Sequence, residues 1–166
     1  ASDGVIELSQ DCALAGCGGT PEELGAAPTD AAQYGVDGGA IYALSGGSVL
    51  KWTEATGTFA PLFAAPGADA IAVDETTVYV GADAGVLSCA KTGCASPATV
   101  AAVGHPSGIA ARGDAVHWVS GGQLYRCAKG ASCVPALVAG GVPSIAAEDA
   151  THLYVPRPPG VRRISK

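Results

Sequence analysis

One histidine and two aspartates are the residues whose types best suit catalysis or ligand binding. His105 lies in the loop Gly104-His105-Pro106-Ser107-Gly108, and a loop imidazole can act as a general acid or base. Asp69 and Asp83 also lie in expected loops, where their carboxylates could bind a cation or a sugar hydroxyl. No ligand spacing points to calcium. The alternative interpretation of His105 is a solvated loop histidine without a catalytic role.

The six cysteines form a second group with its own chemistry. They fall into three close pairs, with spacings of five or six residues: Cys12/Cys17, Cys89/Cys94 and Cys127/Cys133. No pair has the CxxC spacing of a zinc site, and CxxCH, the signature of covalent haem, is absent. The nucleophile elbow GxSxG, the P-loop, HExxH and the EF-hand loop are also missing. The sequence therefore predicts no metal and no cofactor.

Composition narrows the class of protein. The net charge of −6 argues against a nucleic-acid partner, and no apolar run approaches the length of a membrane span. The 48% apolar content, with 24 glycines and 11 prolines, suits short strands joined by tight turns. The chain begins at Ala1 and has no methionine, so we expect a mature or excised chain whose signal peptide has been removed.

An internal repeat organises the chain. Ile71 to Val80 reads IAVDETTVYV, and similar segments start at Tyr34, Ile109 and Ile145, giving steps of 37, 38 and 36 residues. A fixed period of this size indicates a repeat architecture. We divide the chain into a partial repeat at 1–33, full repeats at 34–70, 71–108 and 109–144, and a partial repeat at 145–166.

Each full repeat is expected to hold four short strands, a to d. In the repeat at 71–108 these are Ala70 to Val73, Val78 to Val80, Val86 to Cys89 and Ala98 to Val103, separated by turn residues. No segment sustains a helical period. A four-stranded meander at this period predicts an all-β fold, a β-propeller of about four blades. A β-trefoil has three repeats and a β-helix has shorter coils, so both fit less well.

The ends of the chain are expected to complete the ring. The last repeat offers strands a and b and a c-like run, Gly160 to Ile164, but no strand d. The N-terminal segment offers a strand at Val5 to Leu8, a Cys/Gly loop at Asp11 to Gly19 and one helical turn at Thr20 to Gly25. We expect Val161 to Ile164 to pair with Val5 to Leu8 or the strand after it, within one chain. The alternative is closure between two copies.

The cysteine pairs follow the repeat. Each pair lies across the expected c–d turn, and the repeat at 34–70 lacks both members, having Trp52 and Thr58 instead. The last repeat has Ile164 at the first position. Joint presence or absence is what a bonded pair predicts, and the spacing allows bridging across a hairpin. We therefore predict three local disulfides and an oxidising compartment.

Several segments resemble repeats of secreted or lipid-anchored bacterial propellers, particularly myxobacterial ones. The segments are Gly108-Ile109-Ala110, Asp74 to Tyr79, Gly85 to Cys89 and Lys91-Thr92-Gly93-Cys94. The wider resemblance is to NHL-like and YWTD-like propellers, which implies a binding or scaffold module, with some lyases and hydrolases among them. Only Trp118 keeps the tryptophan of the family's "VYW" motif. Propeller shape alone does not decide between these functions.

Within a propeller, the d–a connection that carries His105 would face the axial funnel, with Asp69 and Asp83 on the same face. His117 takes the strand b position of Tyr79 and Tyr154, which predicts packing, and His152 lies at an a–b turn. Asp37, Asp74 and Asp149 recur at a–b turns, where an Asx-type bond explains them. The basic tail, Arg157, Arg162, Arg163 and Lys166, could meet an acidic partner or be a solvated strand.

Three functions are compatible with these residues and repeats. The favoured one is a non-catalytic, extracytoplasmic module (secreted, periplasmic or on the cell surface) that binds protein or glycan, or assembles with itself, including as a homodimer that completes the ring. The second is a funnel-site lyase or hydrolase that uses His105 with a loop carboxylate. The third is a lectin with repeated inter-blade sites, for which the strand b residues are candidates: Tyr42, Tyr79, His117 and Tyr154. Burial of strand b explains these four equally well.

Overall fold

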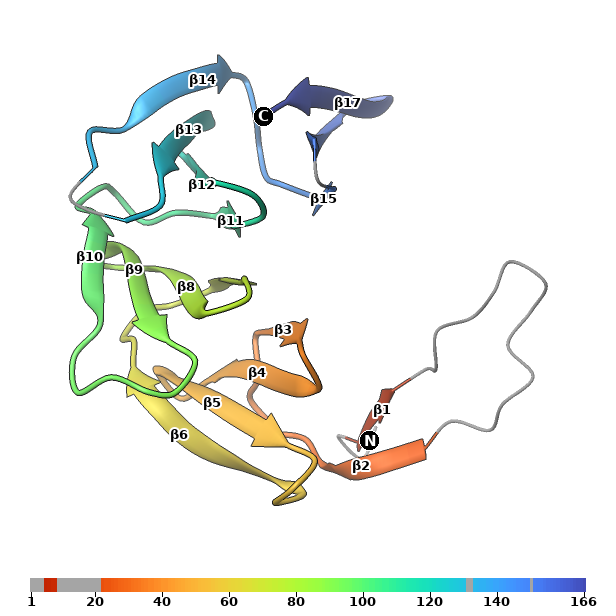
Figure 1. Ribbon diagram of the computed structural model, residues 1–166. Coiled ribbons are helices and arrows are strands. Elements are labelled where there is room, and N and C mark those ends of the chain that lie inside the picture. The colour runs from red at the N-terminus through yellow and green to blue at the C-terminus, as the bar shows by residue number, and fades with distance from the viewer. Residues whose placement is uncertain (1–4, 9–21, 131–132, 150) are drawn as a thin grey trace.

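The fold is an arc of antiparallel sheets. The computed structural model describes residues 5–8, 22–130, 133–149 and 151–166, and within these ranges it has strands and turns but no helix. No helix there is long and apolar enough to cross a membrane. Figure 1 shows the sheets following one another around the arc, with the N-terminal hairpin at one end and the C-terminal sheet at the other.

Three sheets have the predicted four strands. The first contains β3 (Gln33–Asp37), β4 (Ala40–Ser45), β5 (Ser48–Thr53) and β6 (Thr58–Ala64). The second contains β7 (Ala70–Val73), β8 (Thr77–Ala82), β9 (Gly85–Ala90) and β10 (Ala98–Ala101). The third contains β11 (Gly108–Ala110), β12 (Ala115–Ser120), β13 (Gln123–Ala128) and β14 (Ala136–Gly140). Each is a meander paired in chain order, which confirms the predicted blade.

The fourth sheet has three strands, β15 (Ala147–Glu148), β16 (His152–Arg157) and β17 (Gly160–Ser165). Within the described ranges it lacks strand d, as predicted for this part of the chain. In all four sheets strand a lies toward the axis, and in the three complete sheets strand d lies on the rim (Figure 1).

The N-terminal segment differs from one expectation. β1 (Val5–Leu8) is the predicted strand. The helical turn expected at Thr20 to Gly25 is wrong where the structure describes it, because Glu22–Ala26 forms β2. β2 pairs with β1, with Glu22 opposite Leu8. A strand partner satisfies backbone groups that a single helical turn leaves open.

The terminal strands do not close the ring within this chain. β1 and β2 form their own two-stranded sheet, and β17 pairs with β16. Among the described residues, no strand pairs with the other edge of β17. The expectation of closure within one chain was therefore wrong for this structure, and the arc is open between its two ends.

The core is divided among the gaps between neighbouring sheets. One buried cluster joins the first and second sheets, a second joins the second and third, and a third joins the third and fourth. Strand b is buried on both faces in the first three sheets and anchors these clusters; its largest side chains include Tyr42, Val80 and Trp118. A single sheet could not bury both of its faces, so each sheet depends on its neighbours.

Candidate functional site

His105 lies between two carboxylates. Its Nε2 is 2.8 Å from Asp69 Oδ2 and its Nδ1 is 3.2 Å from Asp83 Oδ1. Asp69 precedes β7, Asp83 lies in the β8–β9 turn and His105 lies between β10 and β11. The sequence predicted all three on one face of the propeller, and the structure brings them into contact there.

Local backbone geometry allows this approach. Gly67 has a φ of +69°, and a Cβ at this position would overlap the Asp83 carboxylate. A glycine adopts this conformation without strain and leaves the space that the carboxylate needs. Gly67 therefore helps the β8–β9 turn reach the loop before β7.

The electrostatics of this site favour a charged histidine. The hydrogen bond with Asp69 raises the pKa of His105 against the opposing effect of burial, and the Asp69 charge and the hydrogen bond and charge of Asp83 add to the rise. All three side chains are substantially exposed to solvent. Both ring nitrogens thus contact carboxylates. Within the described ranges, no group of three or more His, Cys, Asp or Glu residues is arranged to hold a metal ion.

Arg157, the fourth candidate residue, lies elsewhere. It ends β16 and is exposed at the β16–β17 turn of the fourth sheet. In the described part of the chain, no hydrogen bond or ion pair joins it to Asp69, Asp83 or His105. The candidate site therefore contains three of the four predicted residues.

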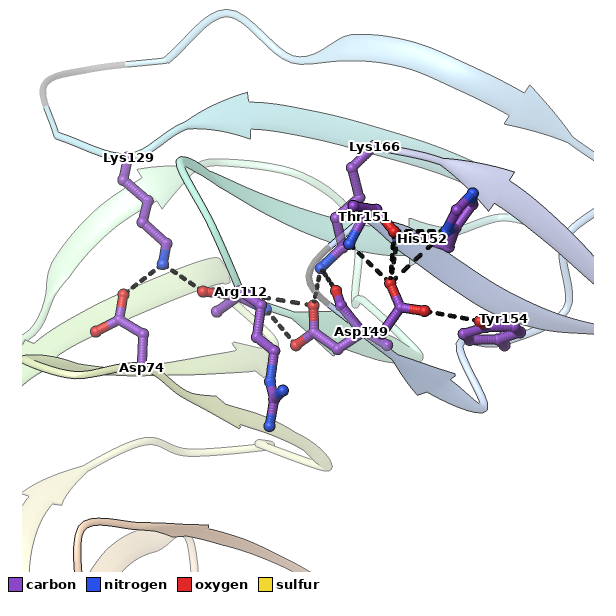
Figure 2. Close-up of polar contacts among 10 residues, drawn as sticks. Asp74, Arg112, Lys129, Asp149, Thr151, His152, Tyr154 and Lys166 are labelled. Atoms are coloured by element: carbon purple, nitrogen blue, oxygen red, sulfur yellow. Dashed lines mark hydrogen bonds and ion pairs between the residues drawn. The ribbon is translucent and has the colours of Figure 1, made fainter.

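The opposite face carries a repeated polar contact that was not among the sequence-based expectations. The residue after strand c is a lysine in the second, third and fourth sheets: Lys91, Lys129 and Lys166. Lys91 pairs with Asp37 of the first sheet, and Lys129 Nζ lies 2.6 Å from Asp74 Oδ2 of the second sheet. Lys129 also donates to the carbonyl of Ala111 (Figure 2). Each of these two lysines thus ties its own sheet to an a–b turn of the preceding sheet.

The a–b turn aspartates have two roles. Asp74 Oδ1 accepts hydrogen bonds from the N–H groups of Thr76 and Thr77, at 2.9 and 2.8 Å. Asp149 Oδ1 accepts in the same way from Thr151 and His152, both at 2.7 Å. The predicted Asx bonds are confirmed for Asp74 and Asp149. For Asp37, the contact that the structure gives is the pair with Lys91.

The third sheet breaks this pattern. Arg112 takes the place of the aspartate, so Lys166 pairs instead with Glu148, at 2.7 Å. The Glu148 carboxylate also accepts hydrogen bonds from the N–H groups of Ala111 and Arg112, at 3.0 and 3.2 Å. Figure 2 shows the Arg112 side chain extending away from the Asp149 cluster.

Two open cavities near the axis are lined by described residues. One, of about 580 Å³, lies among the a–b turns of the first three sheets and includes Val36, Glu75 and Arg112 in its wall. The other, of about 430 Å³, is lined by Gln33 and by residues of the inner strands, including Ile71, Ile109 and Ile145. His105 lines neither cavity.

The strand b residues considered for a lectin are largely enclosed. Tyr42 and His117 are each 1% exposed and Tyr79 is 5% exposed. Tyr154 is half-buried, and its hydroxyl donates to Asp149 Oδ2 at 2.7 Å. This hydroxyl and the two N–H groups of the turn hold the pKa of Asp149 far below its usual range. These contacts are what packing of strand b predicts.

Two of the predicted disulfides lie in the described part of the chain. Cys89–Cys94 and Cys127–Cys133 are bonded, each with a Cα–Cα distance of 5.8 Å. Both pairs begin in strand c and end before strand d, as the repeat predicted. The predicted Cys12–Cys17 pair lies outside the described residues.

Comparison with known proteins supports the fold. No known protein family and no curated protein matches the chain. Among solved structures, hydrazine synthase of Kuenenia stuttgartiensis is 18% identical, with a TM-score of 0.62, over 84% of this chain and 47% of that one. Nidogen from a nidogen–laminin complex is 13% identical, with a TM-score of 0.64, over 83% of this chain and 60% of nidogen. BamB of Moraxella catarrhalis is 13% identical, with a TM-score of 0.61, over 86% of this chain and 43% of BamB.

The class of protein follows from the sheets and from these similarities. Nidogen and BamB are β-propeller proteins, and the repeated meanders here have the same architecture. This chain is an all-β protein built from β-propeller blades. It spans between 43% and 60% of the length of the three similar chains. At these identities the similarity concerns the fold alone.

Proposed function

We propose that this chain is a non-catalytic, extracytoplasmic scaffold that works by association through the open ends of its arc. The observation that carries the proposal is a pair of strand edges that no described strand covers: the edge of β17 in the three-stranded fourth sheet, and that of the separate β1–β2 hairpin. Unpaired strand edges recruit further strands. A second copy of the chain offers a complementary strand at each end.

The composition of the fourth sheet supports this mode of association. Val161 of β17 is 66% exposed on the strand where a strand d would pair. The β2 strand of a second copy would lie beside β17 as a fourth strand, with its partner β1 beyond it, and the same contact repeated by two-fold symmetry would close both ends. Two copies would then give about eight blades by this closure logic. Protein and glycan partners at the same ends are the alternatives to self-association.

The environment of His105 supports a binding module over an enzyme. Both imidazole nitrogens contact carboxylates. These contacts join three loops, the one before β7, the β8–β9 turn and the β10–β11 connection, so the arrangement fits a structural role. The two disulfides favour an oxidising compartment outside the cytoplasm.

The test is the molar mass in solution from micromolar to several hundred micromolar protein, measured by light scattering. We expect a dimer, weakened by Val161→Lys on β17. The matched control is Leu137→Lys on β14, where the native side chain is 60% exposed on a complete sheet; this variant should dimerise normally. A monomer at every concentration, or equal effects of the two variants, would refute self-association.

A further inference from the structure

His117 is a buried histidine that the proposed function does not use. It lies in β12 and is 1% exposed, and neither ring nitrogen has a hydrogen-bond partner among the described residues. Residues two apart in a strand share a face, and Val119 of the same strand packs with Leu153, Val155 and Ile164 of the fourth sheet. His117 therefore faces the joint between the third and fourth sheets.

This joint departs from the other repeats at two positions together. The first, second and fourth sheets carry an aspartate and a tyrosine five residues apart: Asp37/Tyr42, Asp74/Tyr79 and Asp149/Tyr154. The third carries Arg112 and His117 at these places. An acidic group and a phenol have been replaced by two basic groups, and the lysine from the next sheet, Lys166, remains.

The nearby charges are already paired. Arg126, opposite His117 in β13, contacts Asp114 at 3.3 Å. Lys166 contacts Glu148, whose oxygens also accept two backbone N–H bonds. On β11 the residue opposite His117 is Ala110, and Leu153 of β16 belongs to the same apolar cluster. The two carboxylates near His117 are thus committed to other donors, and a proton on the imidazole would find no free acceptor among the described side chains.

We propose that the joint between the third and fourth sheets is acid-labile: protonation of His117 opens it and releases β15–β17 while the first and second sheets stay folded. The buried imidazole is tolerated only when neutral, because a buried charge without a partner is strongly unfavourable. Tyr42 and Tyr79, which take the place of His117 in the first and second sheets, do not gain a charge on acidification. The opening is therefore confined to one end of the arc.

The direction of the pH effect follows from the same environment. Burial, with the positive charges of Arg126 and Lys166, lowers the pKa of His117 to about 4, against the smaller opposing effects of Glu148 and Asp114. In the opened form the pKa returns to about 6.5. The opened form therefore binds more protons between these values, and the joint weakens as the pH falls from about 6.5 toward 4.

Hydrogen exchange followed by mass spectrometry tests this inference. After correction for intrinsic exchange, β16–β17 should lose protection by about fifteenfold in all between pH 6.5 and 5, a window above the usual carboxyl pKa values. Strands β8 and β9 should not change. His117→Tyr restores the residue of the other repeats and should abolish the pH dependence. His152→Gln, in the fourth sheet, is the matched control and should retain it.

A second measurement does not depend on the folding of a variant. The imidazole signals of the unaltered protein should show one histidine titrating well below 6.5, assigned to His117 by its absence from His117→Tyr or through its sequence neighbours Val116 and Trp118. Constant protection of β16–β17 across the window would overturn the proposal. The proposal would also be overturned if His152→Gln abolished the pH dependence of protection, or if His117 titrated near 6.5.

Discussion

Single positions show why equivalent residues in the repeat differ. The fifth residue of strand c is Trp52, Cys89, Cys127 or Ile164, and all four are less than 10% exposed. A disulfide half, an indole and a branched aliphatic chain thus fill the same buried place. Trp52 therefore fills the buried place in the first repeat, which has no cysteines. Because the two cysteines of a repeat are present or absent together, the sequence alone could predict that they are bonded.

His105 gives a first prediction at this scale. His105→Gln should lower the free energy of unfolding by no more than about 1 kcal/mol, because the contacts with Asp69 and Asp83 are exposed to solvent. A raised pKa means that the folded form binds the extra proton, so this stabilisation is present below the unfolded pKa of about 6.5 and is lost as the pH rises through the folded value.

The measurement is urea unfolding of both proteins at pH 6 and pH 9. The difference in the free energy of unfolding between the two proteins should be larger at pH 6. An equal difference at both pH values would show that the charge on His105 contributes nothing to stability. A loss of several kcal/mol would show a structural role beyond the two ion pairs.

At the scale of elements, the sequence predicted strands better than the contacts between sheets. β7 was predicted at its observed bounds, and β8 and β9 each extend by only one or two residues beyond their predicted ends, because alternation and turn residues are local signals. The pairing of Lys129 with Asp74 joins different repeats, so no local pattern reveals it. The available signal was a lysine after strand c in three repeats together with an aspartate after strand a, and the aspartate alone predicts only a local turn.

The contact between sheets supports a second prediction. Lys129→Met should destabilise the protein by about 1 to 2 kcal/mol, because Lys129 and Asp74 are only 20% and 13% exposed and the ammonium lies 5.7 Å from the Tyr79 ring centroid. Arg126→Met is the control: its partner Asp114 is 88% exposed, so its loss should be below about 0.5 kcal/mol. Chemical denaturation of both variants gives the comparison, and equal losses would contradict the role of this contact.

The disulfides support a third prediction. Peptide mapping without reduction should find Cys89–Cys94, Cys127–Cys133 and also Cys12–Cys17. Replacing Cys89 and Cys94 together by serine should lower stability by about 2 kcal/mol at most, since each bridge closes a small loop. A bridge between different repeats would contradict the repeat logic, and global unfolding of the double variant would show that the bridge does more than close its hairpin.

For the whole molecule, the sequence predicted the propeller architecture but not how the ring ends. The period of 36 to 38 residues and the meander recur in each repeat, so they are encoded redundantly in the sequence. Closure requires a single contact, between β17 and a terminal strand. No other repeat contains an equivalent contact, so the sequence does not encode it redundantly. The expectation of closure within one chain rested on counting strands, which cannot distinguish a partner in the same chain from a partner in another.

Association through the open ends gives a fourth prediction. The midpoint of thermal unfolding should rise with protein concentration, because mass action favours the associated form. Deleting residues 1–26, which include β1 and β2, should remove this dependence. A midpoint that is independent of concentration in the unaltered protein would argue that its stability is that of a single chain.

The order of pairing along the chain has a consequence for synthesis. Every described pair of strands joins neighbours in the sequence, from β1–β2 to β16–β17, so each sheet can be completed as soon as its last strand is available. Structures rich in such local contacts form without waiting for distant segments. A chain that emerges slowly, from a ribosome or from an export channel, can therefore pair the strands of one sheet at a time from its N-terminal end, and each sheet is stabilised when the next one packs against it.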